Sequence, residues 1–417
     1  MSRFPMRNLV LATTTAFALG IAGTGAGAGP RASSGDGQLA IASLAPETGA
    51  LAPLLTSLRL PVELAIDEIN AAGGVNGQPV TSSTGDEGSD GTTARASIAA
   101  FAAAGVDAVV GPTAPATVLT VLGDIRRARM LMCSGSDTLA PVTARSSDGL
   151  YFRTAPGPSL QGLALAQLVM ADAHRRVGIL RRDDFFGDEV GAALVHGLRK
   201  SRAHVVADVA YSPALGNVYA KVRAVVRRKP QAIVVIGFDD DAAQVVTTLI
   251  EHGAGPGAVA IYGPDTMQSL GFAAAVDPAD LSKVAGIKGT APSPAPAGGS
   301  TTIPAALSAR GVDPVFSAHV YDCTILTALA AVKAKSDDPD AMKRAFARNL
   351  HGKTDCETFA TCTAFLKGGH SIHWRGASSR FAHFHGFEPG DGMYDTWSYD
   401  ATGRLVAGDP TTQISVP

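Results

Sequence analysis

Residues 60–80 read LPVELAIDEINAAGGVNGQPV, and this stretch decides the fold. Its apolar side chains recur with the spacing of one helix face: Val62, Ala65, Ile66 and Ile69. Asp67 and Glu68 fall on the opposite face, which we expect to meet water. Pro61 suits a first helical position, and Gly73 with Gly74 suits a helix stop. The stretch therefore predicts an amphipathic helix.

Strand patterns flank this helix. The apolar run LAIASL ends at Leu44, and a second extended stretch starts at Val80, so the three elements form a βαβ unit. The unit then repeats, with helices expected at 92–104, 116–128, 160–173, 189–201, 219–228, 242–253, 315–335 and 339–350. Strands are expected at 106–110, 130–133, 177–180, 205–210, 232–236 and 259–262. Short, continuously apolar strands are typical of parallel sheets covered on both faces. The predicted fold class is α/β, with two doubly wound sheets.

Length and composition narrow the function. The 417 residues suffice for two domains, and 46% of them are apolar. The net charge is −2, and no basic run of the kind that binds a phosphate backbone is visible. We expect no nucleic-acid partner.

The N-terminus has the three parts of a secretory signal peptide. Arg3 and Arg7 precede a soft apolar run over 9–22, and small residues follow up to Ala28. We expect cleavage near Ala28, so that residues 1–28 are a signal peptide. No other apolar stretch has transmembrane length, which predicts a periplasmic or secreted mature chain without membrane insertion.

The four cysteines divide into two kinds. Cys356 and Cys362 lie in the polar stretch TDCETFATC, where an oxidising compartment allows a disulfide; two free thiols are the alternative. Cys133 and Cys323 lie in apolar runs, and we expect them to be packed as small apolar residues.

Two phrases identify a family. Residues 46–49, PETG, and 63–80, ELAIDEINAAGGVNGQPV, together resemble the opening of type I periplasmic binding proteins of the branched-chain amino acid and amide group. The segment from Leu350 through the DTWSYD phrase resembles their C-terminal part, which carries a paired-cysteine loop. The resemblance implies a monomeric receptor that binds a small polar ligand, such as an amino acid or amide, and delivers it to an ABC transporter permease. Unlike many receptors of this family, the chain has no cysteine before Cys133 for lipid attachment.

The resemblance also implies how the chain is divided. Two Rossmann-like lobes would be joined by three hinge crossovers near Thr154, Gly289 and Pro389. Lobe 1 would comprise residues 38–155 and 289–389, and lobe 2 residues 156–288 and 390–412. In open α/β sheets a ligand binds beyond the carboxyl ends of the strands, which here means between the lobes.

In lobe 1, the first candidate loop is 111–116, GPTAPA, where Thr113 and the backbone of Ala114 could hold a polar group. Amino-acid-binding relatives place a serine where this chain has Pro115, which has neither hydroxyl nor N–H, so carboxylate recognition is in doubt. Leu54, in the loop 46–54, stands where relatives place an aromatic side chain.

The second candidate loop of lobe 1 is 134–138, SGSDT. The resemblance assigns Ser136 and Thr138 to the ligand's polar head. Asp137 replaces a small uncharged residue, and a carboxylate facing the cleft favours a cationic or donor-rich ligand. Asp137 fits equally well as a helix cap.

In lobe 2, Phe186 and Phe238 follow two strands and could line an apolar part of the pocket, or could pack between helices. Asp265, in YGPD, stands where amino-acid receptors carry the carboxylate that pairs with the ligand ammonium. The alternative interpretation is that Asp265 is an ordinary turn or helix-cap residue.

No enzyme motif, cofactor site or metal site is predicted. Neither a nucleophile elbow nor a zinc-protease motif is found, and the glycines of 253–257 follow a helix and precede a strand, the wrong order for dinucleotide binding. His383 and His385 share a strand face without an acidic partner, and we expect them to be solvated. Two other functions fit the sequence: a ligand-sensing receptor for a signalling partner, and a secreted hydrolase on a similar fold.

Overall fold

The computed structural model describes residues 35–417 except 50, 89–90, 139–141, 143–144, 213, 215, 297–301, 312–313 and 410. The predicted signal peptide lies outside the described residues. Within the described part of the chain, no helix is both long enough and apolar enough to cross a membrane.

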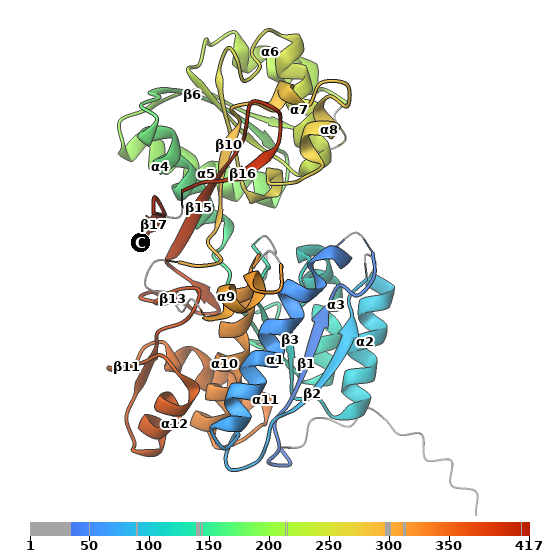
Figure 1. The fold of residues 1–417 in the computed structure, drawn as a ribbon, viewed down its shortest axis with the longest axis vertical. Helices are drawn as coiled ribbons and strands as arrows, with labels where there is room; N and C mark the ends of the chain where they lie inside the picture. Colours follow the sequence, from blue (N-terminus) through green and yellow to red (C-terminus); the bar gives the residue numbers. More distant parts are fainter. Residues whose placement is uncertain are drawn as a thin grey trace, which may run out of the picture.

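Lobe 1, the lower body in Figure 1, contains a five-stranded parallel sheet in the order β2-β1-β3-β4-β5. The strands are β1 (Ala40–Ala45), β2 (Thr81–Asp86), β3 (Ala108–Val110), β4 (Leu131–Ser134) and β5 (Tyr151–Arg153). The helices are α1 (Leu55–Ala71), α2 (Gly91–Ala104), α3 (Pro115–Ala128), α9 (Thr302–Ser308), α10 (Ser317–Ala334), α11 (Pro339–Phe346) and α12 (Phe359–Lys367). One apolar cluster joins the sheet to α1 and α10, and another joins its opposite face to α2 and α3.

Lobe 2, the upper body, contains the sheet β16-β15-β10-β9-β8-β6-β7, with β17 paired to β15. The strands are β6 (Arg176–Arg182), β7 (His204–Tyr211), β8 (Ala232–Ile236), β9 (Ala260–Gly263), β10 (Lys288–Pro292), β15 (Gly392–Tyr399), β16 (Leu405–Ala407) and β17 (Ile414–Val416). Strands β6 to β10 are parallel, whereas β15 runs antiparallel to its neighbours. Helices α4 (Pro158–Ala171) and α5 (Phe185–Lys200) cover one face, and α6 (Val218–Val226), α7 (Asp239–Glu251) and α8 (Phe272–Val276) the other.

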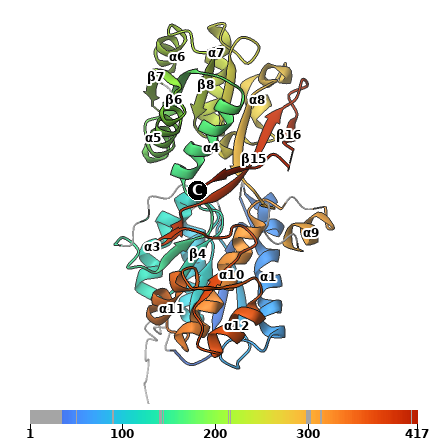
Figure 2. The same cartoon turned by 90° about the vertical axis from the view of Figure 1, so that its left-hand side faces the viewer.

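The chain passes between the two sheets after β5, after β10 and before β15 (Figure 2). Two small pairs lie before the last passage, β11 (Thr354–Cys356) with β12 (Ile372–Trp374) and β13 (Phe384–His385) with β14 (Glu388–Pro389). Short 3₁₀ helices are η1 (Ala52–Leu54), η2 (Asp265–Met267), η3 (Leu281–Val284) and η4 (Ala347–Asn349). Two wound α/β lobes with three connections confirm the predicted fold class.

Helix α1 departs from its prediction in two ways. It begins at Leu55, so Pro61 lies inside the helix and not at its first position, which removes one backbone hydrogen bond. Glu68 does not face water: it accepts hydrogen bonds from the Tyr321 hydroxyl and from the Phe359 backbone N–H, at 2.9 Å for the latter. The helix face that periodicity assigned to solvent is therefore covered in part by α10 and α12.

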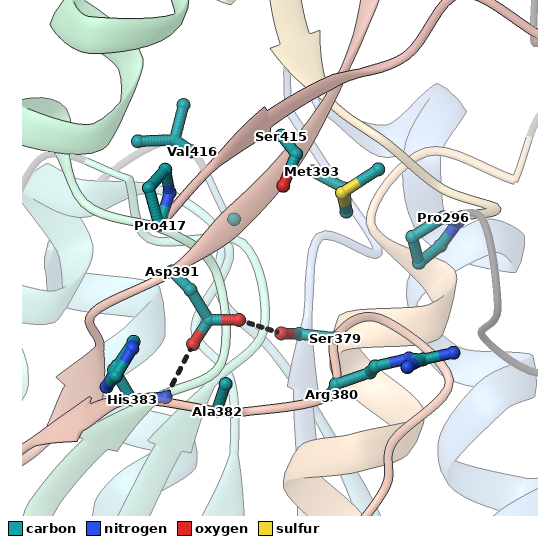
Figure 3. Close-up of a pocket in the computed structure, with 11 residues that line it drawn as sticks. Pro296, Ser379, Arg380, Ala382, His383, Asp391, Met393, Ser415, Val416 and Pro417 are labelled. Atoms are coloured by element: carbon teal, nitrogen blue, oxygen red, sulfur yellow. Dashed lines mark hydrogen bonds between the residues drawn. The ribbon is translucent and has the colours of Figure 1, made fainter.

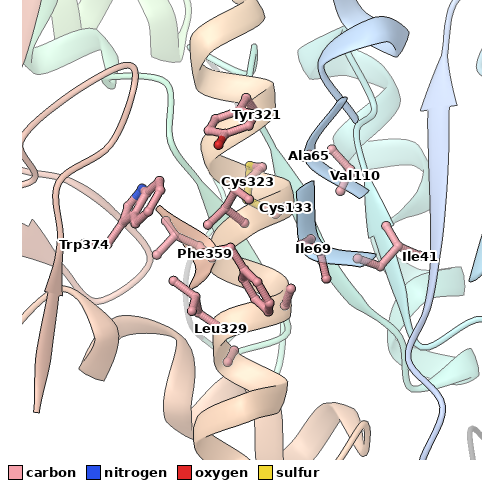
Figure 4. Packing of buried hydrophobic residues seen from close by; sticks show 14 of the residues in the cluster. Ile41, Ala65, Ile69, Val110, Cys133, Tyr321, Cys323, Leu329, Phe359 and Trp374 are labelled. Atoms are coloured by element: carbon pink, nitrogen blue, oxygen red, sulfur yellow. A yellow bond between two sulfur atoms is a disulfide. The ribbon is translucent and has the colours of Figure 1, made fainter. Parts of the chain in front are cut away.

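Helix α10 is buried from Ser317 to Val332 and lies at the centre of lobe 1 (Figure 4). Cys323 on this helix forms a disulfide with Cys133 at the end of β4. The expectation that these two cysteines are only packed apolar groups is therefore wrong, because the fold brings residues 190 positions apart together. The expected disulfide between Cys356 and Cys362 is also present.

Asp322 on α10 is fully buried and holds the chain that follows β12. Its carboxylate accepts hydrogen bonds from the Trp374 indole at 3.1 Å, the Ala377 N–H at 2.9 Å and the Ser378 N–H at 2.7 Å. The Ser378 hydroxyl donates a further bond at 2.5 Å. Burial raises the pKa of Asp322 to about 6, against the lowering effect of these bonds.

Replacing Cys133 and Cys323 together by alanine is expected to lower the free energy of unfolding by about 5 kcal/mol, because the bond closes a long loop in the unfolded chain. Replacing Cys356 and Cys362, only 6 positions apart, serves as the matched control. Its expected loss is about 2 kcal/mol. Denaturant unfolding of the two double variants measures both values, and equal losses would contradict the loop-length explanation.

Replacing Asp322 by alanine is expected to lower the free energy of unfolding by about 3–5 kcal/mol, because several buried donors lose their acceptor. Asp322→Asn keeps one acceptor oxygen and should cost clearly less. Urea unfolding of both variants checks the order. An alanine variant as stable as the asparagine variant would show that the hydrogen bonds do not carry this stability.

Candidate functional site

The loops that follow β3 and β4 meet at one edge of the lobe 1 sheet. The Ser134 hydroxyl donates to the Pro112 carbonyl at 2.7 Å and accepts from the Asp137 N–H at 3.1 Å. The Ser136 hydroxyl donates to the Thr113 carbonyl at 3.2 Å. The two loops predicted from the sequence are therefore brought together, as neighbouring parallel strands require.

A residue that the sequence analysis missed lies beneath these loops. Glu87, just after β2, is fully buried and accepts hydrogen bonds from the N–H groups of Thr113 at 2.5 Å and Ala114 at 3.1 Å. Burial raises the pKa of Glu87, and the two N–H groups act in the opposite direction. The backbone donors predicted to hold a ligand are thus already bonded to the protein. No sequence motif marks Glu87, because its partners lie in the loop between β3 and α3, more than 20 positions further along the chain.

Asp137 is fully buried and turned toward the interior of lobe 1. Its carboxylate accepts from the Tyr151 hydroxyl at 2.5 Å, and its carbonyl accepts from Arg153 at 3.4 Å. Arg153 in turn donates two N–H groups to Glu388, at 2.8 Å for Nε. Burial and the nearby Asp137 raise the pKa of Tyr151 well above its ordinary value.

Asp265 approaches from lobe 2, where it begins η2 directly after β9. Its carboxyl accepts from the Gln161 amide at 2.7 Å and from the Thr266 N–H at 3.0 Å. Burial raises the pKa of Asp265 to about 6, and a hydrogen bond with the Thr138 side chain is among the contacts that limit the rise. Thr138 and Asp265, from opposite sheets, therefore meet between the lobes.

Three buried polar atoms near Asp265 find no hydrogen-bond partner among the described residues: Gln161 Oε1, Thr290 Oγ1 and the Tyr394 hydroxyl. Gln161 contacts both Asp265 and the Thr290 carbonyl, and Asp265 helps to raise the pKa of Tyr394 beyond the effect of burial. Unpaired buried groups are costly, which makes them candidates for contact with a bound molecule. Sequence analysis did not single out these residues, because glutamine and tyrosine inside apolar elements carry no distinguishing pattern.

The two predicted aromatic residues differ in position. Phe186 is 3% exposed and belongs to the core beneath α4 and α5, so the structure supports its packing alternative and not a pocket-lining role. Phe238 is half-buried, stacks on Phe186 with ring centres 5.3 Å apart, and carries the Arg182 guanidinium 4.1 Å above its ring. Phe185, which the prediction passed over, is 45% exposed.

Leu54 is half-buried and packs against the lobe 1 core that includes α1 and α10. It ends η1, in the loop that follows β1. Its apolar side chain thus has a structural role in lobe 1.

A cavity of about 320 Å³ lies at the chain crossings and not among the predicted site residues (Figure 3). Ser379, Arg380, Asp391, Met393 and Pro417 are among its lining residues. The Asp391 carboxylate accepts hydrogen bonds from the Ser379 hydroxyl at 3.0 Å and from the His383 backbone N–H at 2.9 Å, so it already stabilises this turn. Within the described residues, no cluster of three metal-ligating side chains is present.

Comparisons with known proteins agree with this architecture. A family model described as periplasmic binding protein matches residues 38–373. The leucine-binding protein LivK of Thermotoga maritima superposes with a TM-score of 0.64 at 16% identity, over 89% of this chain and 98% of that one. LivJ of Streptococcus pneumoniae, solved in complex with isoleucine, gives a TM-score of 0.63 at 20% identity, over 91% and 100%.

A relative with a signalling role is also similar. The chemotactic signal transduction system substrate-binding protein BasB of Halobacterium salinarum is 25% identical over 340 residues, which is 79% of each chain. The family match spans most of this chain, and the two-lobed structure has the same architecture. The chain therefore belongs to the periplasmic binding protein family.

Proposed function

We propose that this protein is an extracytoplasmic solute-binding receptor that closes on a small polar ligand between its lobes and presents the closed form to an ABC transporter permease. The observation that carries the proposal is that Asp265 of lobe 2, bonded to Gln161 and in contact with Thr138 of lobe 1, lies beside buried polar atoms that have no partner among the described residues. A ligand that contacts both lobes favours the closed state through its differential contacts.

The structure suggests a role for each part of the site. Asp265 is half-buried and keeps a carboxyl group near unpaired polar atoms, which suits a positive or donor group of the ligand. Thr138 and Ser136, in the loop that follows β4 of lobe 1, would contact the polar head of the ligand. Phe238, which is half-buried, and Phe185, which is exposed at the start of α5, offer apolar surface for the ligand body. No catalytic role is proposed for any of these residues.

The boundaries expected from the sequence were 38–155 with 289–389 for lobe 1 and 156–288 with 390–412 for lobe 2. Because β10 (Lys288–Pro292) and β17 (Ile414–Val416) both belong to the lobe 2 sheet, we infer that the second crossing follows β10 and that lobe 2 extends through β17. The likeness to LivK and LivJ supports a transport role, since those proteins are named for leucine binding and branched-chain amino acid transport. We infer export through the predicted leader and a monomeric mature chain.

Sensing is a second candidate function, and the similarity to BasB favours it. The two functions share the ligand site and differ in the partner of the closed form. Deleting the gene should abolish uptake of radiolabelled ligand if the protein serves a permease. Loss of a behavioural response to the ligand with uptake intact would favour sensing instead.

Thermal-shift screening of the mature chain against amino acids, amides, amines and aromatic acids is expected to identify a stabilising ligand. Asp265→Asn should then weaken binding of that ligand at least tenfold, by about 2 kcal/mol, because a charge-assisted hydrogen bond is lost. Asp67→Asn, an exposed carboxylate on α1, is the matched control and should bind normally. Unchanged affinity in Asp265→Asn, measured by calorimetry, would remove Asp265 from the site.

The affinity for a ligand whose charge is constant between pH 5 and 7 should depend on pH. The pKa of Asp265 is about 6, so lowering the pH below that value neutralises the carboxylate that receives the donor group. Affinity should fall about tenfold from pH 7 to pH 5, because proton and ligand compete for the same group. The Asp265→Asn variant should show a flat profile over this range; an equally steep profile in the variant would assign the dependence to another group.

A further inference from the structure

At the start of α3, the backbone donors of Thr113 and Ala114 are not available to an anion. The N–H groups of Thr113 and Ala114 bond to Glu87, and the next residue, Pro115, has no N–H. A helix start normally offers unpaired N–H groups to a carboxylate or phosphate. At α3 a buried side-chain carboxylate already occupies that position.

In the neighbouring loop, four donors of the described residues 134–137 are likewise bonded within the protein. The Ser134 hydroxyl donates to the Pro112 carbonyl, and the Ser136 hydroxyl donates to the Thr113 carbonyl. The N–H groups of Ser136 and Asp137 both point to Ser134 Oγ, at 3.4 and 3.1 Å. An incoming carboxylate would have to break these bonds to be satisfied.

Charge acts in the same direction. Glu87 and Asp137 lie on lobe 1 and Asp265 on lobe 2, all of them buried or half-buried. Arg153, close to Asp137, already donates two N–H groups to Glu388. A second anion close to any of these carboxylates would be repelled, and burial strengthens that repulsion.

The cation at the lobe 2 edge is neutralised as well. Arg182 forms ion pairs with Asp184 at 2.5 Å and with Asp241 at 2.7 Å. Its guanidinium also lies over the Phe238 ring, so it is held in place. It would have to leave these partners to receive a ligand carboxylate.

We propose that the ligand carries an amine and no carboxylate, as a primary amine or an amino-amide, and that Glu87 and Pro115 are the residues that exclude the carboxylate. This inference rests on the proposed solute-binding function and names the ligand class for the same cleft. Asp265 receives the amine from lobe 2, while the group opposite the amine must be neutral. A ligand carboxylate is excluded because Glu87 already accepts the N–H groups of Thr113 and Ala114 and because Pro115 has no N–H to offer.

Matched sets of compounds test the proposal directly. One set shares the leucine side chain: leucine, leucinamide, 3-methylbutylamine and 4-methylpentanoate. A second set shares the benzyl group: phenylalanine, phenylalaninamide, phenethylamine and 3-phenylpropanoate. Calorimetry on the mature protein should show the amide or the amine of a set binding at least tenfold more tightly than the corresponding acids.

Variants at the two excluding positions sharpen the test. Glu87→Gln removes the charge but keeps an acceptor for one N–H, and Pro115→Ser restores an N–H and a hydroxyl. The ratio of the Kd for the amino acid to the Kd for its amide should fall at least tenfold in the double variant. Each single variant should lower this ratio by less. Glu63→Gln, at an exposed position on α1, is the matched control and should leave the preference unchanged. If Glu87→Gln does not fold, Pro115→Ser alone should still tighten amino-acid binding.

The outcomes separate the two proposals. An amino acid or a plain carboxylate that binds wild-type protein as tightly as its amide overturns the exclusion of carboxylates, and the receptor function stands. An unchanged preference in a folded double variant also overturns the roles of Glu87 and Pro115. If no compound of these sets or of the wider screen binds folded protein, the solute-binding function itself is contradicted.

Discussion

Lobe 1 depends on one constraint: α10 is buried along nearly its whole length, so the bonds that its groups form must lie inside the protein. The His319 carbonyl accepts the Thr154 hydroxyl at 2.7 Å, where the chain first leaves lobe 1, and Cys323 is bonded to β4. A Cβ on Gly135 would lie 2.5 Å from the Val320 nitrogen, so the loop after β4 packs directly on the helix. The helix therefore fixes both the first crossing and the loop after β4, which belongs to the proposed ligand site.

A fixed wall matters because closure of two lobes is useful only if each lobe moves as a unit. The hydrogen bonds among Ser134, Ser136 and Thr113 hold the lobe 1 loops to one another, and Gln161 with Thr266 holds Asp265 on lobe 2. Three chain crossings connect the lobes, so on the proposed function the free energy of closure would come from groups that meet between them. A small ligand that adds contacts there shifts the balance between open and closed states.

The fold could be predicted because helix and strand periodicity are local properties, as residues 60–80 illustrate. Even there, the solvent face was assigned wrongly at Glu68, since Tyr321 and Phe359 come from far along the chain. Asp265 became a candidate because the phrase YGPD follows a strand where similar receptors carry a carboxylate, and its role in binding stays a prediction. Glu87 and the bond between Cys133 and Cys323 could not be identified in this way, because the chemistry of each depends on partners that only the folded chain supplies.

Glu87 and Asp265 differ in how completely the polar groups around them are hydrogen-bonded within the protein. Glu87 is satisfied by two backbone N–H groups of its own lobe, so it has little to gain from a ligand. Asp265 is bonded too, yet Gln161 Oε1 and the Tyr394 hydroxyl beside it have no partner among the described residues. Burying such groups costs free energy that only a further contact recovers. On the proposed function, a bound donor would therefore be stabilised most where Asp265 lies, and Glu87 would act by occupying a place that the ligand cannot take.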